Sequence, residues 1–188
     1  MTGAGTRPRE SAAPRPPARA PAQTSLRLFV ALWPGPRVRQ ALAACRDLVR
    51  PAGSSPVATE KLHLTLHFIG SVPAARLAEI EAGLAVPARA FTLCLDAAEH
   101  WRGGVAVLRA GTVPPRLQEL HADLAAALRR LALPVEARAF HPHVTLARRA
   151  APRPQSPTPV APVRWRVTGH ALVHSQPDGR YLVLRRYR

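Results

Sequence analysis

The tetrapeptide His-x-Thr-Leu occurs twice, at His63 and again at His143, eighty positions later. A proline precedes each copy at the same distance, because Pro34 to His63 and Pro114 to His143 both span 29 positions. The order of strand, proline, helix and motif-bearing strand also matches, which predicts an internal duplication. Two β-α-β lobes related by a pseudo-twofold axis would place the two motifs face to face across a cleft.

Apolar residues recur with a period of two in several segments and with helical spacing in others. Strands are predicted at 26–32, 62–68, 90–99, 105–111, 142–148, 164–175 and 180–187. The last two form a hairpin around a Gln-Pro-Asp-Gly turn. Proline pairs at 34/36 and 114/115 each open a helix. Another helix is predicted with Ser71 as its N-cap and Pro73 in its first turn.

A chain of 188 residues with 47% hydrophobic residues suits one domain or two small lobes. Residues 1–24 are rich in Pro, Ala and Arg, which predicts a disordered tail before a folded domain at 25–188. Residues 151–162 have a similar composition and are expected to form a loop. The sequence has no apolar run long enough for a membrane span and no apolar core of a signal peptide, so a cytoplasmic protein is expected.

The formal net charge is +16, although Lys61 is the only lysine. Such a surplus attracts polyanions such as RNA by releasing counterions from phosphates. An arginine-biased composition would give the same charge without any nucleic-acid partner, and charge alone does not separate the two explanations. Cys45 and Cys94 show neither disulfide nor metal-ligand spacing and are expected to be reduced, buried thiols.

Strand parity predicts which side chains of the motif act together. Residues two apart on a strand point to the same face, so His63 projects with Thr65, and His143 with Thr145. The alternate positions are expected in the core: Leu64, Leu66, Phe68, Val144 and Leu146.

Two imidazoles and two hydroxyls around one centre suit phosphodiester chemistry. An imidazole titrates near pH 6.5, so one neutral histidine can take a proton from water while a charged one gives a proton to the leaving alkoxide. The threonine hydroxyls can donate to phosphate oxygens as charge builds there. Neither a metal nor a cofactor is required.

Metal binding is the rival explanation for the histidines. His63 and His67 are four residues apart, but a helical zinc motif requires Glu where Leu64 stands. By parity, His67 and His141 share the faces of the motif histidines and are expected to line the cleft. The remaining histidines are given no role: His100, His121, His170 and His174.

These stretches resemble the 2H phosphoesterase superfamily, and most closely its RNA 2′,3′-cyclic phosphodiesterase branch, also called the LigT-like or 2′-5′ RNA ligase family. The similar segments are LRLFVAL, LHLTLHFIG, FHPHVTLAR and ALVHSQPDGRYLVLRR, which together span residues 26–187. The resemblance implies a bilobal, pseudo-twofold α+β fold in which two antiparallel sheets flank a central cleft with helices outside. It departs at residues 101–111, where the family usually has an aromatic residue near Arg109.

The resemblance implies metal-independent hydrolysis of an RNA-terminal 2′,3′-cyclic phosphate to a 2′-phosphomonoester. By position, His63 would be the proton donor and His143 the proton acceptor, although pseudo-symmetry makes them interchangeable from the residues alone. Arg27 and Arg148 are candidate phosphate ligands. Arg27 is favoured because Arg148 has the opposite parity to His143 and reaches the phosphate only if the strand bends.

Two alternatives stay open at the sequence level. The same site run backwards would join RNA ends through a 2′-5′ bond. A module that holds RNA phosphates without turning them over would use the same surface, but acid–base hydrolysis needs two titrating groups and simple binding does not. The expected partner is RNA with a 2′,3′-cyclic phosphate end, bound by a monomer.

Overall fold

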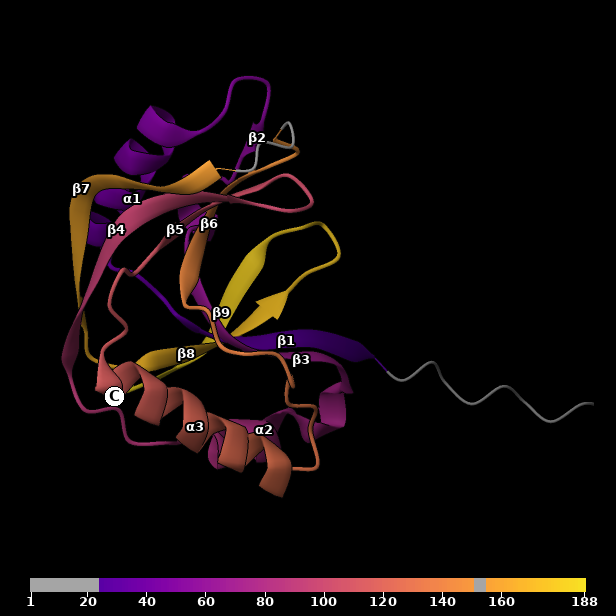
Figure 1. Ribbon diagram of the computed structural model, residues 1–188. Helices are drawn as coiled ribbons and strands as arrows, with labels where there is room; N and C mark the ends of the chain where they lie inside the picture. Colours follow the sequence, from indigo (N-terminus) through magenta and orange to yellow (C-terminus); the bar gives the residue numbers. More distant parts are fainter. Residues whose placement is uncertain (1–23, 151–154) are drawn as a thin grey trace, which may run out of the picture.

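The computed structural model describes residues 24–150 and 155–188, which form an antiparallel sheet with helices at two of its sides (Figure 1). The strands are β1 (Ser25–Leu32), β2 (Ser55–Pro56), β3 (Leu64–Pro73), β4 (Phe91–Trp101), β5 (Val105–Arg109), β6 (His143–Arg148), β7 (Gln155–Val167), β8 (His170–Ser175) and β9 (Tyr181–Tyr187). The α-helices are α1 (Pro36–Val49), α2 (Leu77–Gly83) and α3 (Pro115–Arg130), with short 3₁₀ turns η1 (Thr59–Lys61) and η2 (Ala74–Arg76).

The sheet consists of two halves that repeat each other. Its strand order is β7-β4-β5-β6-β3-β1-β8-β9, and β2 pairs with β6. The central strands β3 and β6 meet at one residue pair, Leu64 with Val144. Reading outward from that pair, β3, β1, β8 and β9 correspond to β6, β5, β4 and β7. The predicted α+β fold with duplicated halves is confirmed, and the two expected sheets are halves of one continuous sheet.

The helices cross over between the halves. Helix α1 joins strands β1 and β3 but contacts β6 and β7 of the other half. Helix α3 joins β5 and β6 but packs against β3, with α2 beside it, as Figure 1 shows. Proline in the first turn of α1 and α3 fits because the amides there need no partner within the helix. Each half therefore depends on a helix supplied by the other.

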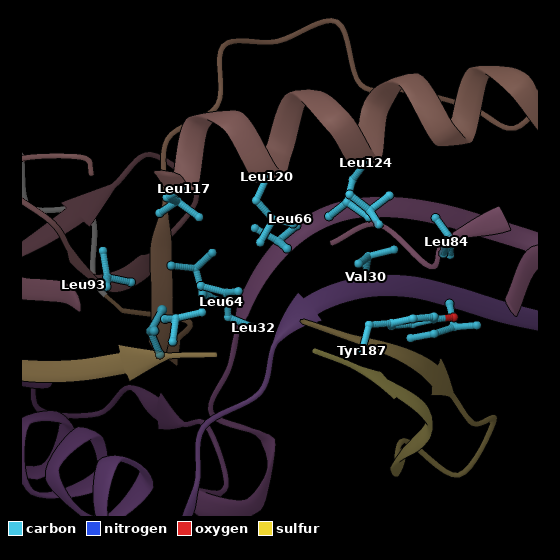
Figure 2. Packing of buried hydrophobic residues seen from close by; sticks show 14 of the residues in the cluster. Val30, Leu32, Leu64, Leu66, Leu84, Leu93, Leu117, Leu120, Leu124 and Tyr187 are labelled. Carbon is cyan, nitrogen blue, oxygen red and sulfur yellow. The ribbon is translucent and has the colours of Figure 1, made fainter. Parts of the chain in front are cut away.

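The core lies behind the motif strands. Leu117, Leu120 and Leu124 point from α3 toward Leu64 and Leu66 of β3 (Figure 2). All five side chains are at most 4% exposed. Burying each leucine contributes about 1.5–3 kcal/mol, so this contact holds the motif strand firmly against its helix.

A β-bulge follows each His-x-Thr pair. In the β1–β3 ladder, Ala31 pairs with Thr65 and Val30 with His67, so Leu66 is the extra residue. In the β5–β6 ladder, Val107 pairs with Thr145 and Ala106 with Ala147, which leaves Leu146 extra. A bulge shifts the alternation of side chains between faces. Beyond the bulge in both copies, counting by twos from the motif therefore predicts the wrong face for each side chain.

The bulge in β3 overturns two predictions from parity. Phe68, expected in the core, is 57% exposed and contacts Phe29 on the opposite face. His67, expected beside His63, is 2% exposed and packs behind the strand, where its Nε2–H donates to the His121 carbonyl at 2.9 Å.

The helix predicted at Ser71 begins later. Ser71, Val72 and Pro73 extend β3, since they pair with Arg27, Leu26 and Ser25 of β1. The 3₁₀ turn η2 follows, and α2 begins only at Leu77. Long-range pairing with β1 outweighs the local capping signal here.

Proline-rich residues 155–162, predicted as a loop, belong to β7 and pair with β4. Strand β7 is at the edge of the sheet, where a strand tolerates proline because one side needs no ladder donor. The predicted strand at 164–175 is two strands, β7 and β8, separated by Thr168 and Gly169. The β8–β9 hairpin is confirmed. The predicted tail falls almost wholly on residues 1–23, which lie outside the described residues, as do 151–154.

Candidate functional site

The two motifs meet at the centre of the sheet. Leu64 and Val144 pair across β3 and β6, and both side chains are fully buried. Their neighbours His63, Thr65, His143 and Thr145 therefore project from the opposite face, and all four are half-buried. The motifs are adjacent on one sheet face, which brings the four polar groups around one centre.

Each histidine is fixed by the backbone two residues earlier. The His63 Nδ1–H donates to the Lys61 carbonyl at 2.5 Å, and the His143 Nδ1–H donates to the His141 carbonyl at 2.7 Å. Because a carbonyl only accepts, the proton of each neutral ring lies on Nδ1. Nε2 is left as the reactive nitrogen in both rings. The Thr65 Oγ1 lies 3.1 Å from the His63 Nε2 and can donate to it.

The surroundings lower the pKa of both histidines below the ordinary value. Burial is the main cause for each ring, and the carbonyl acceptors oppose it. Repulsion from His143 and then Arg148 lowers the pKa of His63 further, and Arg148 is the first charge that lowers the pKa of His143. A bound phosphate would oppose these effects and favour one protonated ring.

Aromatic rings surround His63. Phe29 of β1 lies 5.0 Å from its ring, Trp33 stacks on it at 5.5 Å with an interplanar angle of 21°, and Tyr181 of β9 meets it edge-on at 5.4 Å. Phe29, Trp33 and Tyr181 belong to a small apolar cluster separate from the main core. The cluster lies on the same face as the motif and forms one wall of the site.

Different side chains surround His143. Trp101 of β4 lies 4.3 Å from its ring. Arg109 pairs with His143 across β5 and β6, and its Nε lies 2.7 Å from Glu99. Trp101 thus supplies an aromatic ring beside His143, from the segment where the sequence departs from the family pattern.

The bulge at Leu146 brings Arg148 to the site. Counting from Thr145 across the extra residue, Arg148 returns to the face of the motif, and its charge lowers the pKa of both histidines. The bend that the sequence argument required for Arg148 is therefore present. Arg27 is exposed and pairs with Ser71, and it is not among the charges that lower the pKa of His63 or of His143. The geometry favours Arg148 over Arg27.

Several site residues were not foreseen from the sequence. The tryptophans and Tyr181 come from distant elements, so no local pattern marks them. Lys61 was detectable, because it occupies the position that matches His141, two residues before each motif histidine. His141 is exposed, its carbonyl accepts from the His143 Nδ1–H, and its side chain also lowers the pKa of His143.

The described residues contain no cluster of three or more His, Cys, Asp or Glu side chains that could hold a metal ion. Cys45 and Cys94 are half-buried free thiols, and burial raises the pKa of Cys45. Within residues 24–150 and 155–188, no helix is long and apolar enough to cross a membrane.

A doubled fold with one histidine and one threonine from each half defines a class of phosphoesterase, and comparison with known proteins identifies the family. The chain belongs to the 2′-5′ RNA ligase superfamily, whose family model matches residues 34–179.

Relatives cover most of the chain. It is 35% identical to the RNA 2′,3′-cyclic phosphodiesterase of Thermus thermophilus, over 86% of this chain and 89% of that protein. The protein of the same description from Escherichia coli is 32% identical over 86% and 95% of the two chains. The crystal structure of E. coli LigT complexed with 3′-AMP superimposes with a TM-score of 0.78 at 32% identity, covering 87% of this chain and 98% of that one.

Proposed function

We propose that the protein hydrolyses RNA-terminal 2′,3′-cyclic phosphates to 2′-phosphomonoesters without a metal ion. The observation that carries this proposal is the matched pair of histidines, in which each Nδ1–H donates to a carbonyl and each Nε2 is left for proton transfer. The relatives in T. thermophilus and E. coli bear the name of this activity.

In the proposed reaction, the His143 Nε2 takes a proton from water as the water oxygen attacks phosphorus. The bond between phosphorus and the 3′ oxygen breaks, and protonated His63 gives its Nε2 proton to that oxygen. The phosphate remains on the 2′ oxygen. At the end, His143 is protonated and His63 is neutral, so a proton exchange with solvent restores the starting state.

The different surroundings support these roles. Arg148 is the leading charge that keeps His143 neutral, as a base requires. His63 is enclosed by aromatic rings, whose electron-rich faces attract a cation. Thr65, Thr145 and Arg148 would hold the non-bridging phosphate oxygens, where negative charge increases in the transition state.

The direct experiment is incubation with an oligonucleotide that ends in a 2′,3′-cyclic phosphate, in excess EDTA, followed by determination of the product's phosphate position. The proposal expects complete conversion to a 2′-phosphate. A joined product with a 5′-hydroxyl oligonucleotide present would instead support ligation as the main reaction. Binding without turnover would show a phosphate-binding module and overturn the proposal.

A further inference from the structure

Two rings that contact His63 each hold a cation. The Arg39 Cζ lies 5.8 Å from the centroid of Trp33, and the Lys61 Nζ lies 5.9 Å from the centroid of Tyr181. Both distances are within the range of a cation–π interaction. Arg39 comes from α1 and Lys61 from η1, so two separate elements place a positive charge one ring away from His63.

These charges are held in place without being neutralised. An aromatic ring orients a cation but carries no net charge. Among the described residues, neither Arg39 nor Lys61 forms an ion pair with a carboxylate. The Arg39 Nη2 donates to the Pro34 carbonyl at 2.9 Å, while its buried Nε has no hydrogen-bond partner in this part of the chain.

A third cation–π pair shows the contrast. Arg185 lies 5.6 Å from the ring centroid of Tyr187, away from the motifs, and its Nη1 is 3.9 Å from the Glu81 carboxylate. There the charge has an anionic partner within the protein. Beside His63, no carboxylate of the described residues pairs with either charge, so both are open to an anionic ligand.

Among the residues that the structure describes, cations stack on rings beside His63 and not beside His143. The positions eighty residues after Trp33 and Arg39 are Val113 and Glu119, which supply neither ring nor positive charge. Each charge also lies against a ring that contacts His63, while Thr65, Thr145 and Arg148 would surround the reacting phosphate. The anion that meets Arg39 and Lys61 is therefore a second one, carried by the same ligand. A polynucleotide supplies it as a backbone phosphate, with bases that stack on exposed rings.

We propose that Arg39 and Lys61 form a polynucleotide subsite that receives backbone phosphates of the RNA chain preceding the terminal nucleotide. This inference rests on the proposed function of the same site. It assigns a direction, because the RNA leaves the site across Trp33 and Tyr181 on the His63 half. It also makes oligonucleotide ends better ligands than mononucleotides.

The test measures the Kd of an oligonucleotide ending in a 2′-phosphate and the Kd of a nucleoside 2′-monophosphate, between about 50 and 200 mM salt. Arg39→Met and Lys61→Met remove the charges and keep the apolar stems, and Arg185→Met is the matched control. Each loss of one phosphate contact should flatten the salt dependence of log Kd for the oligonucleotide by about 0.7. The factor by which each substitution raises the Kd of the oligonucleotide should then be about 2.5-fold larger at the lower salt concentration.

The subsite predicts that the preference for oligonucleotide over mononucleotide decreases in both subsite variants and stays at the wild-type value in Arg185→Met. Equal weakening of both ligands, or an unchanged salt slope, would overturn it. Because binding of product-like ligands does not require turnover, failure of the subsite can be distinguished from failure of the proposed function. The latter fails if the wild-type protein does not hydrolyse the cyclic phosphate.

Discussion

The two halves of the sheet present the same motif on the same bulged strand and surround it with opposite chemistry. Phe29 and Phe68 lie on the His63 half, and the residues eighty positions later are Arg109 and Arg148. The backbone was duplicated faithfully, down to the bulges at Leu66 and Leu146. The side chains against the motifs diverged: three rings contact His63, whereas Arg109, Arg148 and Trp101 lie beside His143. We call these the aromatic half and the cationic half.

This divergence separates the two histidines chemically. Both Nδ1 atoms are anchored in the same way, so geometry alone gives neither ring a distinct role. The surroundings differ: Arg148 is the first charge that lowers the pKa of His143, whereas for His63 the first charge is His143 itself and rings contact the imidazole. A symmetric scaffold thus supports an asymmetric reaction.

The largest effect is expected from removing either histidine. His63→Ala and His143→Ala should each lower kcat by at least about 10²-fold, since each supplies one proton transfer. The double variant should be little worse than either single one, because the two roles belong to one mechanism. Steady-state kinetics on a cyclic-phosphate substrate measure this.

His174→Ala is the matched control, since His174 pairs with Leu28 on β1 and lies outside the site. It should retain wild-type kcat. A single motif variant that keeps more than about a tenth of wild-type kcat would contradict the role given to that histidine.

The second-largest effect is expected from removing the threonine hydroxyls of the two motifs. Thr65→Val and Thr145→Val keep the shape and remove the hydroxyl, so kcat/KM should decrease roughly 10–10³-fold, the range for a lost transition-state donor. Thr65 also lies 3.1 Å from the His63 Nε2, which should make its loss the larger of the two. Unchanged kinetics in both variants would mean that the hydroxyls have only a structural role in the strands.

Arg148 should affect the pH profile as well as the rate. Its charge lowers the pKa of both histidines, so Arg148→Met should raise both pKa values and displace the bell-shaped profile of kcat/KM toward higher pH. The limbs belong to the coupled pair and not to single residues. Arg27→Met, the control from the opposite half, should leave the profile in place. A displacement toward lower pH would contradict the account.

The smallest effect concerns stability behind the site. His67 and His121 stack at 4.0 Å, and burial followed by repulsion from His67 lowers the pKa of His121 to about 4. A folded-state pKa below the ordinary 6.5 means that stability is complete above pH 6.5 and is lost as pH decreases toward 4. The Tm of His121→Phe should therefore vary less over this interval than that of the wild type. Parallel Tm curves would contradict this.

The repeat, the paired motifs and the strands that carry them could be predicted, because each depends on local spacing. The bulges could not, since an extra residue in a ladder is set by the partner strand. For this reason the parity rule predicts the wrong faces for Phe68 and His67. For the same reason it favours Arg27 over Arg148 as a phosphate ligand. Trp101 and Tyr181 come from distant strands, so only the assembled sheet places them beside the histidines.

The central claim is that the aromatic half holds the acid and the cationic half holds the base. A substrate with sulfur in place of the bridging 3′ oxygen tests it, because a thiolate leaves without protonation far more readily than an alkoxide. The account predicts that the kcat loss in His63→Ala shrinks by at least about tenfold on this substrate. The loss in His143→Ala should stay the same. Recovery in His143→Ala instead, or equal losses on both substrates, would contradict the account.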